Sequence, residues 1–274
     1  MEKRSLVRTD QEAWMPVPRY EAIIFDLDGT LYCGDEPIQG SQDVLSRLRA
    51  EVACRFLSNN GEQMSSAIAR RLAGMGMEIR APDVITSADL VIDTVHKEFP
   101  GCRFFPLVSP VLETALVDLG CTSSSRAADL VVSGVPTTVT YQDLTSALRL
   151  LRAGAKLIVT NEDPIFPADG GFFPAAGAIA GALRGMGFAP DLFCGKPDVR
   201  AVRQALSEWG IDDPSQCLFV GDNLGTDIQA AINLGADSAL VLTGVSAPSE
   251  LTACEAHPTY VLPSIADLPA AIGS

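Results

Sequence analysis

The segment Ala22–Leu31 has the sequence AIIFDLDGTL. Its first four residues are apolar and typical of a buried strand, and Asp26 and Asp28 follow directly at its end. Two carboxylates this close repel each other, so they need a cation or a shared proton. Gly29 then lets the chain turn away from the strand. The segment therefore predicts a buried strand that ends in a polar site.

The same pattern of apolar runs and helical stretches recurs toward both ends of the chain, which predicts an α/β fold with a parallel sheet of βαβ units. The expected strands are 22–25, 55–57, 218–220 and 239–242, and the expected helices are 44–52, 64–72, 199–209 and 228–232. Three of these strands end at Asp26, Ser58 and Asp222. Ligands bind outside the carboxyl ends of parallel strands, so the three residues are expected to converge. Taken singly, each is also typical of a helix cap, which is the favoured interpretation for Ser58 alone.

The middle of the chain is expected to form an α/β unit of its own. Its strands are predicted at 104–108, 130–133 and 157–160, and its clearest helix at 144–151. The predicted organisation is an N-terminal extension (1–20), a core split between 21–83 and 191–274, and an inserted domain (84–190).

The composition narrows the range of partners. The chain has 274 residues, 47% of them hydrophobic, and a net charge of −14. This acidity disfavours nucleic acid and anionic lipid surfaces, so small molecules or proteins are the expected partners. No signal peptide or membrane-spanning stretch is expected. Seven scattered cysteines without a CxxC pair fit a reduced, cytoplasmic protein.

Four motifs together resemble those of the haloacid-dehalogenase (HAD) superfamily of aspartate-nucleophile phosphotransferases. The first is DLDGTL at 26–31 and the second is SNN at 58–60. The third is GKP at 195–197, and the fourth is GDN at 221–223 with Thr226 and Asp227. The resemblance implies a Rossmann-like parallel-sheet core and covers the chain except its first 20 residues.

Motif spacing indicates the branch of the superfamily. Only 26 residues separate Leu31 from Ser58, whereas 137 separate Ser58 from Lys196. An α/β cap between the second and third motifs resembles the class IIA, NagD-like branch, some of whose members dimerise, so a homodimer is one expectation. The cap segments TNEDP (160–164) and PAAGA (174–178) add to the match. They depart from the family's Asn-Pro-Asp and Pro-Gly-Ala-Gly-Ala, which leaves the substrate open.

The resemblance implies catalytic roles for the residues at the strand ends. Asp26 is expected to attack phosphorus, and Asp28 to act as general acid and base. Asp28 must then start protonated, which its anionic neighbours would favour. Mg²⁺ is the expected cofactor, held by the carboxylates of Asp26 and Asp222 and by the backbone carbonyl of Asp28. Lys196 is expected to neutralise phosphate charge.

The remaining candidates are expected to bind substrate or to support the catalytic groups. The expected phosphoryl-binding residues are Ser58, Asn59 and Asn60, and the supporting residues are Thr30, Asn223 and Asp227. Thr30 would orient Asp28 or the local turn, and Asp227 would order Lys196 or metal-bound water, or else serve as a helix N-terminal acid. The cap residues Asn161, Glu162 and Asp163 are candidates for contacting the leaving group, although such a strand-to-loop segment is also typical of a solvated turn.

The function hypothesis is a Mg²⁺-dependent phosphatase for small-molecule phosphate monoesters, acting through an aspartyl phosphate on Asp26. Candidate substrates are phosphoglycolate, glycerol phosphate, nucleoside monophosphates, pyridoxal phosphate and sugar phosphates. One alternative is a catalytically idle relative that binds or regulates. Another is a response-regulator-like phosphoacceptor, which the position of Asp26 on the first strand disfavours.

Overall fold

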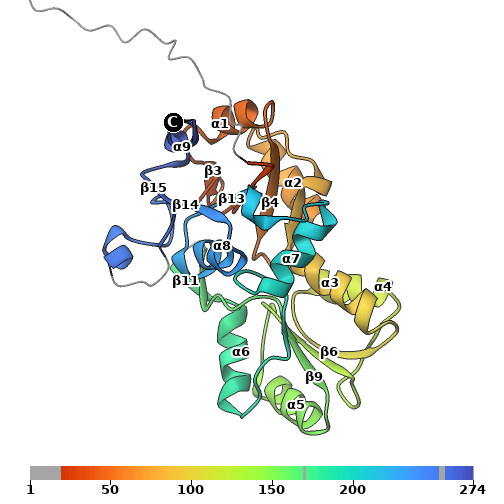
Figure 1. Ribbon diagram of the computed structural model, residues 1–274. Helices are drawn as coiled ribbons and strands as arrows, with labels where there is room; N and C mark the ends of the chain where they lie inside the picture. Colours follow the sequence, from red (N-terminus) through yellow and green to blue (C-terminus); the bar gives the residue numbers. More distant parts are fainter. Residues whose placement is uncertain (1–19, 169–170, 253–256, 274) are drawn as a thin grey trace, which may run out of the picture.

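The chain folds into two α/β units, which lie one above the other in Figure 1. The computed structural model describes residues 20–168, 171–252 and 257–273. The expected N-terminal extension therefore lies, apart from Tyr20, outside the described residues. Within them, no helix is both long and apolar enough to cross a membrane.

The upper unit in Figure 1, the core, is built on a six-stranded parallel sheet. Its order is β15 (Tyr260–Leu262), β14 (Asp237–Val241), β13 (Cys217–Gly221), β1 (Ala22–Phe25), β4 (Ala53–Ser58) and β5 (Val84–Thr86). The segment AIIF forms the central strand β1 because all four of its side chains are buried. Phe25 pairs with Phe56 on one side and Val220 on the other, so the carboxyl ends of β1, β4 and β13 lie together.

Helices cover both faces of the core sheet, because successive strand residues point to opposite sides. Ile23 and Phe25 pack with α1 (Ser41–Leu48), α2 (Ser65–Gly74) and α9 (Leu268–Ile272). Ala22 and Ile24 belong to the opposite face, which carries α3 (Ser87–Glu98), α7 (Val199–Glu208) and α8 (Gln229–Leu234). The short antiparallel pair β2 (Tyr32–Cys33) and β3 (Glu36–Pro37) follows the first motif.

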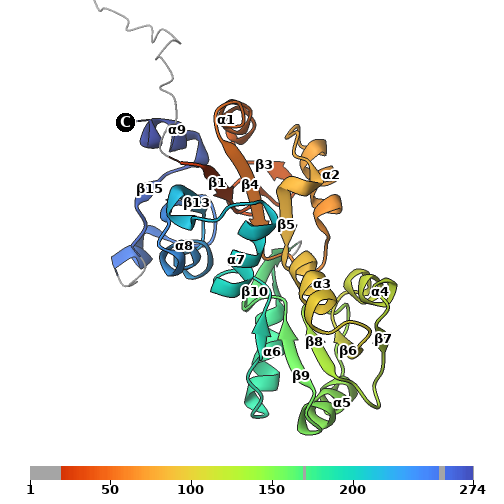
Figure 2. The ribbon, with the colours of Figure 1, turned by 45° about the vertical axis from the view of Figure 1, so that its right-hand side comes forward.

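The lower unit, the cap, has a five-stranded parallel sheet (Figure 2). Its order is β12 (Leu192–Phe193), β9 (Lys156–Val159), β8 (Leu130–Ser133), β6 (Arg103–Leu107) and β7 (Thr122–Ser123). One face packs with α3 and α4 (Pro110–Asp118), and the other with α5 (Tyr141–Arg152) and α6 (Ala176–Gly185). A hairpin of β10 (Ile165–Ala168) and β11 (Gly171–Pro174) precedes α6.

The boundaries between the two units differ from those expected. The strand β5 lies beyond residue 83, the expected end of the first core segment, yet it pairs with β4 in the core sheet. The strand β12 lies beyond residue 190, the expected end of the cap, yet it pairs with β9 in the cap sheet. Backbone pairing thus extends the first core segment through Thr86 and the cap sheet through Phe193.

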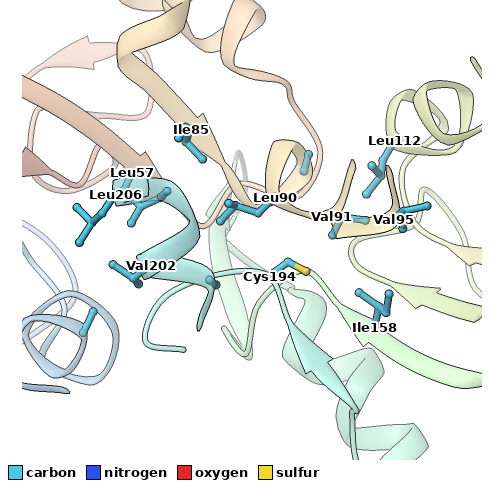
Figure 3. Close-up of a cluster of buried hydrophobic side chains, with 14 of the residues drawn as sticks. Leu57, Ile85, Leu90, Val91, Val95, Leu112, Ile158, Cys194, Val202 and Leu206 are labelled. Atoms are coloured by element: carbon cyan, nitrogen blue, oxygen red, sulfur yellow. The ribbon is translucent and has the colours of Figure 1, made fainter. Parts of the chain in front are cut away.

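The two units share one hydrophobic cluster (Figure 3). Leu57 and Ile85 enter it from the core sheet, and Ile158 enters it from the cap sheet. Side chains of α3 and α7, among them Val91 and Val202, belong to the same cluster. The cap therefore rests on the core through continuous packing, which fixes where the cap loops stand relative to the strand ends.

A buried carboxylate joins the segments at the amino-terminal ends of β4 and β5. Asp83 is 3% exposed and accepts hydrogen bonds from Arg49 (3.3 Å), Arg55 (3.0 Å) and Arg80 (2.9 Å). Burial alone would raise the pKa of Asp83, but the hydrogen bonds and charges of these arginines lower it overall. Asp83 immediately precedes β5, so this contact holds the edge strand of the core in place.

The substitution Asp83→Asn is expected to lower the free energy of unfolding at pH 7 by about 3 kcal/mol, because it leaves three guanidinium groups without their shared anion. The pKa of Asp83 is lower in the folded state than in the unfolded state, where it is about 3.9. Its contribution is therefore complete above the unfolded pKa and is lost as the pH falls through the folded pKa.

Urea unfolding of both proteins between pH 7 and pH 3 measures this difference. The control is Asp35→Asn, since Asp35 is 95% exposed and its pair with Arg71 should contribute less than about 0.5 kcal/mol. Equal losses in the two variants would contradict the assignment.

Candidate active site

Three carboxylates meet at the carboxyl edge of the core sheet. Asp26 follows β1, Asp222 follows β13, and Asp227 lies in the π-helical turn Leu224–Ile228. One carboxylate oxygen from each of the three residues lies within 4.8 Å of the other two. The expected convergence of Asp26 and Asp222 is therefore present, and Asp227 joins them. Oxygen donors grouped in this way suit a hard divalent cation such as Mg²⁺.

Lys196 places a positive charge inside this group. Its Nζ donates hydrogen bonds to Oδ1 of Asp26 and Oδ1 of Asp227, both at 2.6 Å, and its side chain is 3% exposed. Burial alone would lower the pKa of Lys196, but the charges of Asp227 and Asp26 more than offset this and raise it. Lys196 is therefore held in its charged form.

Asp227 is fixed from two sides. Its Oδ2 accepts the backbone N–H of Asn223 at 3.1 Å, while its Oδ1 holds Lys196. A Cβ at Gly221 would overlap the Asp227 side chain, so this close approach needs glycine. The side chain of Asn223 accepts the N–H of Gly225 at 2.8 Å and so caps the local turn.

Burial and mutual repulsion act on the other two carboxylates. Desolvation raises the pKa of Asp26, and the charge of Lys196 opposes this rise. Desolvation, followed by the charge of Asp227, raises the pKa of Asp222 to about 7. A single lysine does not balance three buried carboxylates, so the arrangement fits a further cation that would keep Asp26 and Asp222 ionised.

Asp28 is separate from this buried group. Its side chain is exposed at the edge of the site, yet the atoms around its carboxyl raise its pKa by desolvation, against the charge of Arg71. The direction agrees with a carboxyl that starts protonated, but the cause is desolvation rather than the neighbouring anions invoked from the sequence. The buried Thr30 hydroxyl donates to Oδ2 of Asp26 at 3.5 Å, so it contacts the expected nucleophile rather than Asp28.

The second motif contributes the hydroxyl group of Ser58 and a loop that its own side chains stabilise by hydrogen bonds. Ser58 ends β4, is 8% exposed, and its Oγ accepts the N–H of Asn60 at 3.2 Å. The side-chain oxygen of Asn60 accepts the backbone N–H groups of Glu62 and Gln63. Asn60, an expected substrate ligand, therefore uses its oxygen to shape the loop after β4.

Asn59 joins the core to the cap. Its Oδ1 accepts the backbone N–H of Lys196 at 2.8 Å, and its Nδ2 donates to the Lys196 carbonyl and to Oδ2 of Asp163, both at 3.0 Å. The cap residue Asn161, 4% exposed, donates from its Nδ2 to the Asn59 carbonyl at 2.6 Å. Three expected substrate ligands (Asn59, Asn161 and Asp163) thus hold the cap loop against the segment that carries Lys196.

Glu162, the third cap candidate, pairs with a cap residue and not with Asn59. It forms an ion pair with Arg184 of α6 at 2.5 Å, and both side chains are partly exposed. It also lines a cavity of about 700 Å³ at the junction of the two units, together with Phe193, Lys196, Pro197, Arg200 and Arg203, among others. Of the three cap candidates, Glu162 is the one that lines this cavity, and Lys196 is the catalytic candidate that lines it too.

The loop 243–246, which contains none of the residues predicted for the site, also contacts it, because the Val245 N–H donates to Oδ2 of Asp222 at 2.5 Å. The position of the preceding strand in the sheet could have indicated this loop. The strand predicted at 239–242 ends at the same edge of the sheet as the other three, so the loop after it was also a candidate.

Comparisons with known proteins identify the family of the chain. Residues 23–122 match the haloacid dehalogenase-like hydrolase family, and residues 193–268 match the HAD-hydrolase-like family. An acid sugar phosphatase of Staphylococcus epidermidis is 34% identical over 256 residues, covering 92% of this chain and 97% of that protein.

Two solved structures share the whole architecture. The 4-nitrophenylphosphatase of Thermotoga maritima has a TM-score of 0.86 and 32% identity, covering 93% of this chain and 98% of its own. The glycerol phosphate phosphatase of Mycobacterium tuberculosis, in complex with magnesium, has a TM-score of 0.81 and 30% identity, covering 92% of this chain and 77% of its own.

The chain belongs to the haloacid-dehalogenase superfamily, and within it to the class IIA, NagD-like hydrolases. It is a HAD-type phosphatase that acts on small-molecule phosphates. The family and fold inferred from the motifs are thereby confirmed.

The bridge from Asn59 to Asp163 can be tested by exchanging its donor and acceptor. Asn59→Asp keeps the oxygen that accepts from Lys196 but replaces the donor with a carboxylate oxygen facing Asp163. We expect kcat to fall more than about 10-fold, because repulsion displaces the Lys196 segment. Adding Asp163→Asn restores a donor to the pair and should recover about 5-fold or more.

Steady-state kinetics of both single variants and the double variant give the coupling between the two positions. If the two effects are simply additive, Asn59 acts on the substrate alone and the bridge has no catalytic role.

Proposed function

We propose that the protein hydrolyses small phosphate monoesters with the help of Mg²⁺, through a phosphoryl group carried transiently on Asp26. The observation that carries this proposal is the buried group of Asp26, Asp222 and Asp227 around Lys196 at the carboxyl edge of the sheet. Burying charged groups costs more free energy than burying apolar side chains of similar size, so stability alone does not account for this group.

Asp26 and Asp222 are the side chains that we assign to the metal, with the backbone carbonyl of Asp28. Asp227 is assigned to Lys196 instead, because it does not follow a strand end directly and it holds Lys196 through Oδ1 and the backbone N–H of Asn223 through Oδ2. When bound, the metal would offset the charge of the carboxylates and of the incoming phosphate. The magnesium complex of the related glycerol phosphate phosphatase supports this choice of ion.

The first half of the reaction forms a covalent intermediate. A carboxylate oxygen of Asp26 attacks phosphorus, and the bond from phosphorus to the ester oxygen breaks in line with the attack. Asp28 gives its proton to the departing alkoxide, for which its raised pKa prepares it. The alcohol leaves, and Asp28 is then ionised.

The second half regenerates the enzyme. Asp28 takes a proton from water as the water oxygen attacks phosphorus, the bond to Asp26 breaks, and inorganic phosphate departs. Lys196 keeps a positive charge beside the phosphoryl oxygens throughout. Ser58 accepts the Asn60 N–H through its Oγ, so its own O–H proton remains available to donate to a phosphoryl oxygen.

The leaving group is assigned to the cavity beside Glu162. Glu162 lines this cavity and offers an acceptor, Phe193 offers an apolar face, and Arg184, which contacts both residues, offers a donor beside them. A polyhydroxylated leaving group suits such a pair, because each hydroxyl both donates and accepts. The relatives named acid sugar phosphatase and glycerol phosphate phosphatase support sugar and polyol phosphates among the candidate substrates.

The catalytic assignment predicts complete dependence on Asp26. Asp26→Asn should lower kcat/KM on a panel of phosphate esters at least about 1,000-fold, since the amide is a far weaker nucleophile. The panel contains sugar phosphates, glycerol phosphate, phosphoglycolate, nucleoside monophosphates, pyridoxal phosphate and p-nitrophenyl phosphate. EDTA should abolish activity in the wild type, and Mg²⁺ should restore it.

Asp129→Asn is the control for Asp26→Asn, because Asp129 pairs with Arg103 in the cap and is half exposed. Wild-type rates in Asp26→Asn would refute the mechanism. No turnover by the wild type on the whole panel would favour a binding role instead.

Glu162→Ala tests the assignment of the leaving-group site. Removing its carboxylate should lower kcat/KM for a sugar phosphate relative to p-nitrophenyl phosphate by about 10-fold, because one charged hydrogen bond to a hydroxyl is lost. Asp129→Ala breaks a comparable exposed pair with Arg103 and should leave the ratio unchanged. An unchanged ratio in Glu162→Ala would remove Glu162 from substrate selection.

A further inference from the structure

A loop outside the four motifs contacts two of them at once. The loop 243–246 follows β14 and contains Thr243, Gly244, Val245 and Ser246. It touches the turn after β1 and the acidic segment after β13, which are far apart in the sequence. Its contacts are with the backbone and carboxylate atoms of those segments, so its geometry bears directly on the active site.

The first contact fixes the turn that follows the nucleophile. Oγ1 of Thr243 donates to the Gly29 carbonyl at 2.6 Å. Gly29 has a φ of 79°, and a Cβ there would lie 2.5 Å from Oδ2 of Asp222 and 3.0 Å from Cα of Gly244. The turn and the loop therefore leave no room for a side chain at Gly29, and the Asp222 carboxylate lies beside them.

The second set of contacts holds Asp222. Its Oδ2 accepts the N–H of Val245 at 2.5 Å, and its backbone carbonyl accepts the N–H of Ser246 at 3.0 Å. Oγ of Ser246, which is 5% exposed, in turn accepts the N–H of Leu224 at 2.9 Å. A Cβ at Gly244 would overlap Oδ2 of Asp222, so only glycine lets the loop come this near.

Holding one oxygen of a carboxylate also sets the direction of the other. Because the loop holds Oδ2 of Asp222, it also sets the direction in which Oδ1 points. The same loop holds the turn after β1, which carries Asp28. Groups that orient a metal ligand without touching the metal change metal affinity by about 10- to 100-fold. The loop is placed to do this for the two segments that would hold the ion.

We propose that the loop 243–246 is a positioning element that sets the distance between the Asp28–Thr30 turn and Asp222 and thereby the affinity for the divalent cation. Thr243 and Gly244 are its positioning residues. Thr243 acts through its hydroxyl, and Gly244 acts through the absence of a side chain. The inference rests on the proposed function, since it takes Asp26 and Asp222 as metal ligands.

The test is Mn²⁺ binding to the purified full-length protein without substrate, measured from the electron paramagnetic resonance signal of free Mn²⁺. Thr243→Val keeps the size of the side chain but removes the donor, and should weaken Mn²⁺ binding about 10-fold. Thr243→Ser keeps the hydroxyl and should bind within about 2-fold of the wild type. Gly244→Ala should weaken binding at least as much as Thr243→Val, by displacing Oδ2 of Asp222.

Val111→Ala is the matched control, because the Val111 side chain is 52% exposed on α4 of the cap and belongs neither to the loop nor to the acidic group. It should bind Mn²⁺ as the wild type does. Unfolding temperatures in EDTA identify any variant that fails to fold, and Gly244→Ala tests the same claim without altering Thr243.

Wild-type affinity in both Thr243→Val and Gly244→Ala would overturn the positioning role while leaving the proposed function intact. A wild-type protein that binds no Mn²⁺ and ignores EDTA would overturn both. Weakened binding with rescue by Thr243→Ser would support the proposal, because a merely structural loss would appear equally in the EDTA unfolding temperatures.

Discussion

The ammonium group of Lys196 lies 2.6 Å from Asp26 and 2.6 Å from Asp227, almost wholly out of contact with water. Such an ion group is costly to bury, and it persists only if every member is paired and held. The rest of the architecture supplies that support. The side chain of Asn59 accepts the backbone N–H of Lys196, and the backbone N–H of Asn223 donates to Asp227. The absence of a side chain at Gly221 lets Asp227 approach the end of β13.

The same lysine links chemistry to the cap. Its backbone is bound by Asn59, and Asn59 is bound by the cap residues Asn161 and Asp163. A displacement of the cap loop would therefore be transmitted to the nucleophile through two hydrogen-bonded residues. This arrangement connects the cap, which lies within the 137 residues between Ser58 and Lys196, to the charged side chains at the edge of the core sheet.

The sequence predicted most accurately the residues that directly follow the ends of buried strands. Asp26 and Asp222 could be found because a buried strand precedes each of them, and parallel strands share one edge. The roles of Asn59, Asn161 and Asp163 could not, because their partners lie about a hundred residues away along the chain. The strands β5 and β12, which extend three residues past the expected boundaries, are too short to show a period in the sequence. Val245 contacts Asp222 through its backbone N–H, which almost every residue type carries, so the sequence does not reveal this contact.

The central claim is that Asp26 carries the phosphoryl group between two in-line displacements. The stereochemical course at phosphorus tests this most directly, with a phosphate ester made chiral by oxygen isotopes and an alcohol that accepts the phosphoryl group in place of water. Two successive inversions return the starting configuration, so the account predicts net retention. Net inversion would mean a single direct displacement and would contradict it.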